Sequence, residues 1–257
     1  VLVFGSAGVG KTSLVNALTG ESLPTSARAR GVTLSSQEVS THHDGVGYRI
    51  IDTAGLDEAD GGSVSGTEAV KGLARLLKKS KHGLNLMVMV VPKGRILAST
   101  LNNYELFINK MVGKSVPLLI VVTHCEREAG DMQGWVETNE RDFISRGIIS
   151  SRMVATTFMS PDPELDNVEH MQGKVNASIA LSWGAIQSCA TALPVNFPNE
   201  NGGVLSVLRG MYNSIARLFG HKAIWVDGSL VDRVQKMTSV KLDEARRFVQ
   251  QAEFCDG

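Results

Sequence analysis

The stretch GSAGVGKTS, residues 5–13, constrains the fold of this chain more than any other, because it follows four apolar residues and precedes a helical pattern. From Gly5 to Thr12 the spacing is G-x-x-x-x-G-K-[ST]. Its glycines let the backbone bend with N–H groups turned towards phosphate oxygens. Apolar residues then recur at helical spacing up to Leu18. A strand, a glycine-rich turn and a helix in this order predict a loop that binds the phosphates of a nucleotide.

The residues of this loop have separate expected roles. Lys11 is expected to reach the terminal phosphates as a point charge, and Thr12 to place its hydroxyl on Mg²⁺. The helix that begins near Lys11 presents its positive N-terminal end to the same anion. The residues expected to contact the phosphates are Gly5, Ser6, Ala7, Gly8, Val9, Gly10, Lys11, Thr12 and Ser13.

The composition narrows the choice of partners. Lys plus Arg and Asp plus Glu both number 26, so no net charge draws the chain to nucleic acid or to an acidic membrane. Cys125, Cys189 and Cys255 are widely spaced without a C-x-x-C pair. This spacing fits a reducing compartment and argues against a disulfide framework or a zinc site. We expect a cytoplasmic protein without a nucleic-acid partner.

The sequence contains no obvious signal peptide or transmembrane run. The longest apolar candidate, residues 177–194, carries hydroxyl and amide side chains, which predicts a buried or partner-facing helix. Peripheral attachment to a membrane stays open. The chain begins inside a predicted strand without methionine, so we expect further residues before Val1.

Strand-like and helical segments alternate, which predicts an α/β fold with a mostly parallel sheet and helices on both faces. Strands are expected at 1–4, 37–43, 47–52, 84–91, 116–123 and 152–158, and helices at 11–19, 68–79, 101–112 and around Trp135 and Phe143. Residues 22–35 and 56–66 read as loops. After about residue 195 a Pro/Asn/Gly-rich linker leads into charged amphipathic helices. We therefore predict one α/β domain over residues 1–195 and a helical segment over 196–257.

Polar residues end or follow several predicted strands. They are Asp52, Thr53, Lys93, Thr123 and Thr157. Ligands of open α/β sheets bind at the carboxyl ends of the strands. We expect these side chains, which are distant in sequence, to meet on one rim.

One of these strands ends in Asp52-Thr53-Ala54-Gly55, the D-x-x-G arrangement of guanine-nucleotide switches. Asp52 is expected to hold Mg²⁺ through water. The N–H of Gly55 is expected to bond the γ-phosphate, so that the loop behind it distinguishes a triphosphate from a diphosphate.

A hydroxyl residue that closes over Mg²⁺ is expected in the loop before the second strand. Thr33 is the usual residue type and is ranked first. Ser35 and Ser36 remain alternatives, and Ser36 lies nearer the strand.

The base is expected to be recognised where the fifth strand ends, in VVTHCERE. Guanine offers two N–H donors that a carboxylate accepts together, and adenine has no such pair. Glu126 is the predicted acceptor, beside Thr123, and His124 can stack on the base. A backbone N–H within residues 155–158, ATTF, is the candidate donor to guanine O6.

With these motifs in place, the chain resembles the septin-related P-loop GTPases. The nearest groups are the immune-associated nucleotide-binding GTPases and the chloroplast outer-envelope import receptors, together with fungal G-domain proteins of that group. The resemblance covers about residues 1–160 and rests on GSAGVGKTS, IIDTAGL, LNLMVMVVPKGRI and VVTHCE followed by Trp135 and Asn139. It implies that residues 1–195 form a G domain that binds GTP or GDP with Mg²⁺.

The resemblance also bears on hydrolysis. Leu56 stands where many small GTPases carry a glutamine that orients the attacking water, so slow intrinsic hydrolysis is expected. In similar proteins two G domains dimerise across the nucleotide and one supplies a charge to the other. Arg95 matches the Gly-Arg of a motif in that family and is the candidate arginine acting in trans. The expected catalytic groups are therefore Lys11, Gly55 and Arg95.

Two other functions stay open on the sequence. An assembly module would bind GTP, hydrolyse it negligibly and use the nucleotide to set a dimer or filament. An ATP-dependent phosphotransferase would leave Glu126 without a role, and no residues suggest its catalytic base. The amphipathic stretch 204–219 is expected to pack on the G domain or, alternatively, to bind a partner or a membrane surface.

Overall fold

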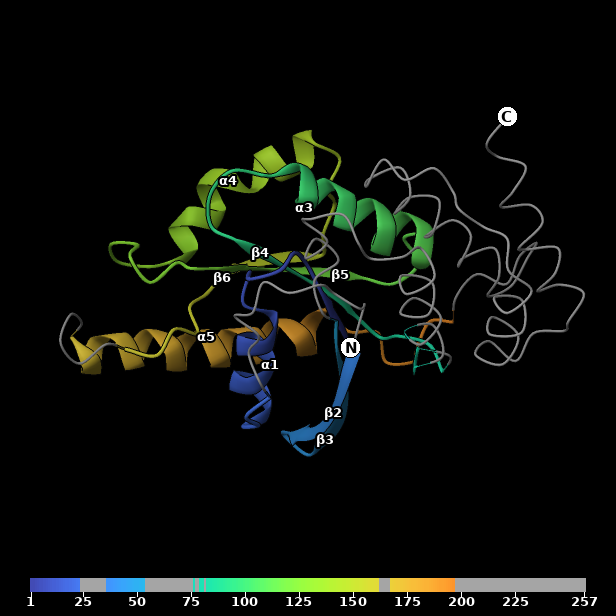
Figure 1. Ribbon diagram of the computed structural model, residues 1–257, viewed down its shortest axis with the longest axis horizontal. Coiled ribbons are helices and arrows are strands. Elements are labelled where there is room, and N and C mark those ends of the chain that lie inside the picture. Colours follow the sequence, from blue (N-terminus) through green and yellow to red (C-terminus); the bar gives the residue numbers. More distant parts are fainter. Residues whose placement is uncertain (24–35, 54–75, 77–78, 81, 162–166, 197–257) are drawn as a thin grey trace, which may run out of the picture.

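A computed structural model describes residues 1–23, 36–53, 76, 79–80, 82–161 and 167–196 of the chain (Figure 1). Several predictions concern residues outside these ranges. They are the roles of Gly55 and Leu56, the choice of Thr33 or Ser35 at Mg²⁺, most of the predicted helix 68–79, and the C-terminal segment from residue 197 onwards.

The described strands form one six-stranded sheet in the order β2-β3-β1-β4-β5-β6. Their bounds are Leu2–Phe4 (β1), Ser36–His43 (β2), Val46–Thr53 (β3), Met87–Pro92 (β4), Leu118–Thr123 (β5) and Arg152–Ala155 (β6). Neighbouring strands are parallel except for the β2–β3 hairpin, which is antiparallel. Positive φ angles of 49° at Asp44 and 75° at Gly45 form its turn. The predicted mostly parallel α/β sheet is confirmed.

Helices cover both faces of this sheet (Figure 1). Helices α1 (Lys11–Thr19) and α5 (Val168–Cys189) lie on one face. On the other face lie α3 (Ala98–Asn103), the π-helix η2 (Tyr104–Met111) and α4 (Gln133–Ser145). This layered arrangement leaves the ends of the strands as the place where loops from many elements meet.

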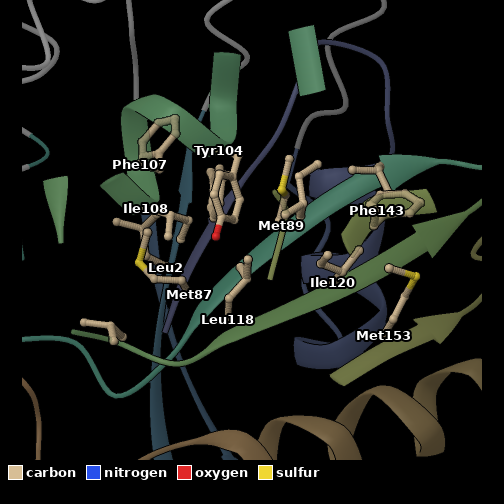
Figure 2. Close-up of a cluster of buried hydrophobic side chains, with 14 of the residues drawn as sticks. Leu2, Met87, Met89, Tyr104, Phe107, Ile108, Leu118, Ile120, Phe143 and Met153 are labelled. Carbon is tan, nitrogen blue, oxygen red and sulfur yellow. The ribbon is translucent and has the colours of Figure 1, made fainter. Parts of the chain in front are cut away.

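The central strands are apolar along their whole length because both of their faces are buried. Figure 2 shows one face, where Tyr104, Phe107 and Ile108 of η2 pack over residues of three strands. Those strand residues are Leu2, Met87, Met89, Leu118 and Ile120. The intervening residues of the same strands, such as Val88 and Val121, face α1 and α5. This period of two fixes the register of the sheet.

Helix α5 also packs against the β2–β3 hairpin through Trp183. The Trp183 ring stacks on His43, with ring centroids 4.2 Å apart and planes at 7°, and lies 4.8 Å from Tyr48. Gln187 Nε2 donates a hydrogen bond to Asp44 Oδ2 at 3.1 Å. No helix in the described ranges is long and apolar enough to cross a membrane.

Some predicted bounds are wrong. A single α-helix was expected over 101–112, but α3 begins at Ala98 and the chain widens into the π-helix from Tyr104. This π-helix buries the consecutive residues Leu106, Phe107 and Ile108, each at most 2% exposed.

Three other elements have bounds that differ from those predicted. Strand β6 ends at Ala155 and not at 158, because the next residues turn towards α5. Strand β4 begins at Met87, since Leu84 instead forms an isolated bridge with Val195. Helix α5 starts before the predicted 177, where the side chain of Asn167 caps it by accepting the N–H of His170.

The end of β1 yields a prediction about stability. Gly5 has φ of +146°, and a Cβ there would lie 2.3 Å from Val90 O in β4. Gly5→Ala should therefore lower the free energy of unfolding by at least about 2 kcal/mol in urea denaturation.

Gly20→Ala is the matched control. Gly20 also has a positive φ, +74°, but no atom of the described residues lies within 4 Å of its added Cβ. Only the backbone strain of about 1 kcal/mol applies there. Equal losses at the two glycines would contradict a close approach between Gly5 and β4.

Candidate functional site

The turn between β1 and α1 has the geometry of an anion-binding loop. Gly5, Gly8 and Gly10 all have positive φ, at 146°, 71° and 92°. Gly10 stands directly before α1, so the N–H groups of the first helical turn border the loop. A loop of this shape with a helix N-terminus behind it is suited to bind phosphate.

Lys11 lies across this loop. Its Nζ donates a hydrogen bond to Ser6 O at 2.6 Å, and the side chain is 6% exposed. The ammonium group is therefore held beside the inward-facing backbone of the loop. This places one positive charge where the terminal phosphates of a nucleotide are expected to lie.

The loop is also held from α3. Asn103 Nδ2 donates to Ser6 Oγ at 3.2 Å and to Ser99 O at 2.9 Å, and Asn103 is 2% exposed. Nothing in the sequence indicated this residue, because its partner in the loop lies 97 positions away. Asn103 is the last residue of α3, directly before the helix widens into η2.

Asp52 and Thr12 form the candidate metal site. Thr12 Oγ1 donates to Asp52 Oδ2 at 2.9 Å. The other oxygen, Asp52 Oδ1, is buried and accepts no hydrogen bond from the described residues. A buried carboxylate oxygen with free acceptor capacity beside a hydroxyl matches the oxygen ligands that Mg²⁺ prefers. No group of three or more His, Cys, Asp or Glu side chains in the described ranges could hold a metal ion.

Burial raises the pKa of Asp52. The hydrogen bond from Thr12 and the charge of Lys11 act in the opposite direction but do not offset the burial. Ionisation of Asp52 therefore costs more free energy in the protein alone than in water, and a bound cation would offset this cost.

A second group of residues lies where β5 and β6 end. Thr157 Oγ1 donates a hydrogen bond to Glu126 Oε2 at 3.1 Å. His124 is exposed with φ of 61°, and its Nδ1 lies 3.1 Å from Thr123 Oγ1. The carboxylate of Glu126 thus has a defined position, while the imidazole beside it faces solvent.

The backbone of residues 155–158 leaves one N–H for a ligand. Thr156 N donates to Val122 O at 2.7 Å, and Thr157 N donates to Ser178 Oγ at 2.9 Å. Ala155 N donates to Gln133 Oε1 at 3.1 Å. The N–H of Phe158 has no acceptor among the described residues.

Thr123 connects the two groups. It is 3% exposed, and its Oγ1 lies 2.7 Å from Val9 O in the phosphate loop. The predicted rim therefore forms: Asp52, Thr123 and Thr157 lie at the same edge of the sheet, next to the loop of Lys11. Lys93, also on the rim, forms an ion pair with Glu128.

Arg95 lies apart from these contacts. It follows β4, is exposed, and makes no hydrogen bond or ion pair within the part of the chain that the structure describes. Ser36, the third candidate for Mg²⁺, is the first residue of β2, and its carbonyl accepts a hydrogen bond from Lys79.

The fold is that of a P-loop GTPase domain. Residues 1–124, just under half of the chain, match the sequence model of a family described as 50S ribosome-binding GTPase. A search of curated proteins finds no match.

Among solved structures, the chain is similar to the chloroplast translocon components atToc33 and psToc159, for which dimerisation is important for GTPase activity. The sequence in that solved structure is 22% identical to this chain, and the alignment covers 74% of this chain and 82% of the other, with a TM-score of 0.53. A dimerisation-deficient mutant of Toc33 from Arabidopsis thaliana is 21% identical with a TM-score of 0.47, covering 74% and 85%. Era, in complex with MgGDPNP and part of 16S ribosomal RNA, is 14% identical with a TM-score of 0.50, covering 77% and 59%. At these identities the likeness shows the fold.

The buried carboxyl yields a pH-dependent prediction. The pKa of Asp52 in the folded protein is raised above its usual value of 3.8. Protonation of Asp52 therefore adds to the free energy of unfolding at pH values below 3.8. This contribution is lost as the pH rises through the folded pKa. Asp52→Asn should therefore raise the free energy of unfolding of the nucleotide-free protein at about pH 7, and this advantage should shrink towards about pH 4.

Urea denaturation at several pH values without Mg²⁺ measures both effects. Asp142→Asn, at an exposed position of α4, is the control and should change the stability little at any pH. A stability gain in Asp52→Asn that does not depend on pH would contradict the burial of an ionisable group.

Proposed function

We propose that this protein binds GTP and GDP with Mg²⁺ and acts as a switch that hydrolyses GTP slowly. The observation that carries the proposal is the contact of Thr123 with Val9. It joins a phosphate loop containing Lys11 to a loop in which Thr157 holds the carboxylate of Glu126. Separate loops of either kind are common, but their connection at one sheet edge fits a nucleotide with a base and several phosphates.

In this proposal the phosphate half of the site binds charge. Lys11 and the loop N–H groups bind the β- and γ-phosphates, and Thr12 and Asp52 hold Mg²⁺, the latter through water. Mg²⁺, when bound, neutralises charge that develops on the phosphate oxygens. Gly55 and Thr33, which lie outside the described residues, would contact the γ-phosphate and Mg²⁺ and so sense hydrolysis.

The base half supplies specificity. Glu126 accepts the N1–H and N2–H of guanine together, and the hydroxyl of Thr157 keeps the carboxylate in place. The N–H of Phe158 donates to guanine O6. The exposed ring of His124 stacks on the base. Adenine offers neither the paired donors nor the O6 acceptor.

Glu126→Ala tests the base half. The substitution removes the acceptor of two guanine N–H groups. The affinity of the variant for GDP and GTP should therefore fall by about 100-fold, while its affinity for ATP should stay unchanged. Titration with fluorescent GDP, GTP and ATP analogues in Mg²⁺ measures this. Glu137→Ala, at an exposed position of α4, is the control. Equal affinity of the wild-type protein for ATP and GTP, unchanged in Glu126→Ala, would contradict guanine recognition.

We further propose that hydrolysis accelerates when two G domains dimerise. Leu56 cannot orient water, so the domain lacks the glutamine that many small GTPases supply in cis. Arg95 is exposed and without a described partner, and is free to reach a second protomer. The similar translocon components, for which dimerisation is important for GTPase activity, support this part of the proposal.

Arg95→Ala separates the switch from the alternative, an assembly module with negligible hydrolysis. If Arg95 acts in trans, turnover at protein concentrations that favour dimers should fall by about 10³-fold or more. Turnover of the dilute monomer should not change. Phosphate release measured across a protein concentration series tests this, with the exposed Arg146→Ala, directly after α4, as control. A concentration-independent rate, equal in wild type and Arg95→Ala, would favour the assembly module.

We also propose that the protein belongs to one particular group of P-loop GTPases. The PKGRI segment and the Trp135 and Asn139 pair support membership of the septin-related group that includes immune-associated GTPases and import receptors. We also propose a cytoplasmic location, with the amphipathic stretch 204–219 as the alternative contact to a membrane surface.

A further inference from the structure

Helix α5 contacts the base half of the site through Lys174. Its Nζ donates hydrogen bonds to Glu126 O at 2.7 Å and to Glu128 O at 2.9 Å. The lysine is only partly exposed and comes from a helix 48 positions further along the chain. A long-range lysine that binds two carbonyls of one loop fixes the path of that loop.

One turn further along the same helix, Ser178 contacts the other loop. Ser178 Oγ accepts the N–H of Thr157 at 2.9 Å and donates to Lys174 O at 2.8 Å. Ser178 is 1% exposed. A buried hydroxyl that is both donor and acceptor holds its partner firmly, because losing either bond would leave a buried polar group unsatisfied.

These contacts close a ring around the carboxylate that is expected to recognise guanine. Lys174 holds the backbone of Glu126, Thr157 holds its carboxylate at 3.1 Å, and Ser178 holds Thr157. Both ends of the glutamate side chain are therefore positioned from one turn of α5.

Such support matters more for glutamate than for aspartate. Glutamate has one more rotatable bond, and a flexible side chain loses up to about 2 kcal/mol of conformational entropy when it is fixed. Two N–H donors can be accepted together only if the carboxylate is already oriented. A ring of contacts that restricts Glu126 before the base arrives reduces this loss.

We infer that Lys174, with Ser178, is a positioning residue that sets the selectivity for guanine. The inference rests on the proposed guanine recognition by Glu126. Lys174 touches neither base nor phosphate. It acts by holding the loop from which Glu126 reaches the N1–H and N2–H donors.

The experiment compares GDP, IDP and ADP affinities of the full chain in Mg²⁺. IDP lacks the N2 amino group, so the ratio of its Kd to that of GDP reports how well Glu126 accepts both donors. Lys174→Met should weaken GDP binding about tenfold and lower the IDP/GDP and ADP/GDP ratios, while the ADP affinity stays unchanged. Lys174→Arg keeps donors for both carbonyls and should retain most of the selectivity.

Two further variants make the test specific. Lys110→Met removes a lysine that pairs with Glu105 on η2, 3.2 Å away, and should leave all three affinities unchanged. In a Glu126→Ala background, Lys174→Met should have no further effect on the ratios, because the group that it positions is gone.

Ser178→Ala provides an independent route if Lys174→Met does not fold. It removes the acceptor of Thr157 N–H and should lower the same ratios. Thermal melts show whether each variant is folded.

The outcomes distinguish the two proposals. A wild-type protein that binds ADP as tightly as GDP overturns the proposed function. If the wild type prefers GDP and Lys174→Met keeps its full preference, only the positioning role is overturned. Equal losses of GDP and ADP affinity would show a structural role for Lys174 and would also overturn it.

Discussion

The hydrogen bond between the buried Thr123 hydroxyl and Val9 O is the contact on which the site depends. Parallel strands bring their carboxyl ends to one edge, but this alone does not fix the loops that leave them. The bond attaches the phosphate loop to the end of β5, where the base-recognition loop begins. Because both atoms are buried, losing the bond would cost about 1–3 kcal/mol through unsatisfied polar groups. The spacing between the phosphate loop and the loop of Glu126 is therefore part of the folded core.

The sequence predicted best what depends on local chemistry. The phosphate loop and the β2–β3 turn require particular residues in consecutive positions, and the apolar strands of a parallel sheet are recognisable one by one. Asn103, Lys174 and Ser178 were not predicted, because each contacts the site from a helix and nothing in its own neighbourhood marks it. The end of β6 was also predicted too late, because the contact between Thr157 N–H and Ser178 joins residues 21 positions apart. The change of helical pitch at Tyr104 has no signal in the apolar pattern, which fits an ordinary α-helix equally well.

Several groups in the phosphate half of the site lower the stability of the folded protein when no ligand is bound. Asp52 is buried with an oxygen that accepts no described hydrogen bond, and its ionisation is penalised by burial. Lys11 is almost fully buried beside it. A preorganised arrangement of this kind would favour the binding of a metal ion and phosphates, because few groups need to move. Without these ligands, the same arrangement lowers the free energy of unfolding. Affinity and intrinsic stability are thus opposed at this position.

Helix α5 contacts two distant parts of the domain. Lys174 and Ser178 in its first half hold the base-recognition loops, while Trp183 and Gln187 contact the β2–β3 hairpin. Its 22 residues extend over about 33 Å at 1.5 Å per residue. A helix with contacts at both ends links them thermodynamically: a ligand that binds the hairpin and displaces α5 would also shift the loop of Glu126. By reciprocity, a ligand that binds at the loop of Glu126 and moves α5 would change the affinity of the hairpin for its own ligand by the same factor.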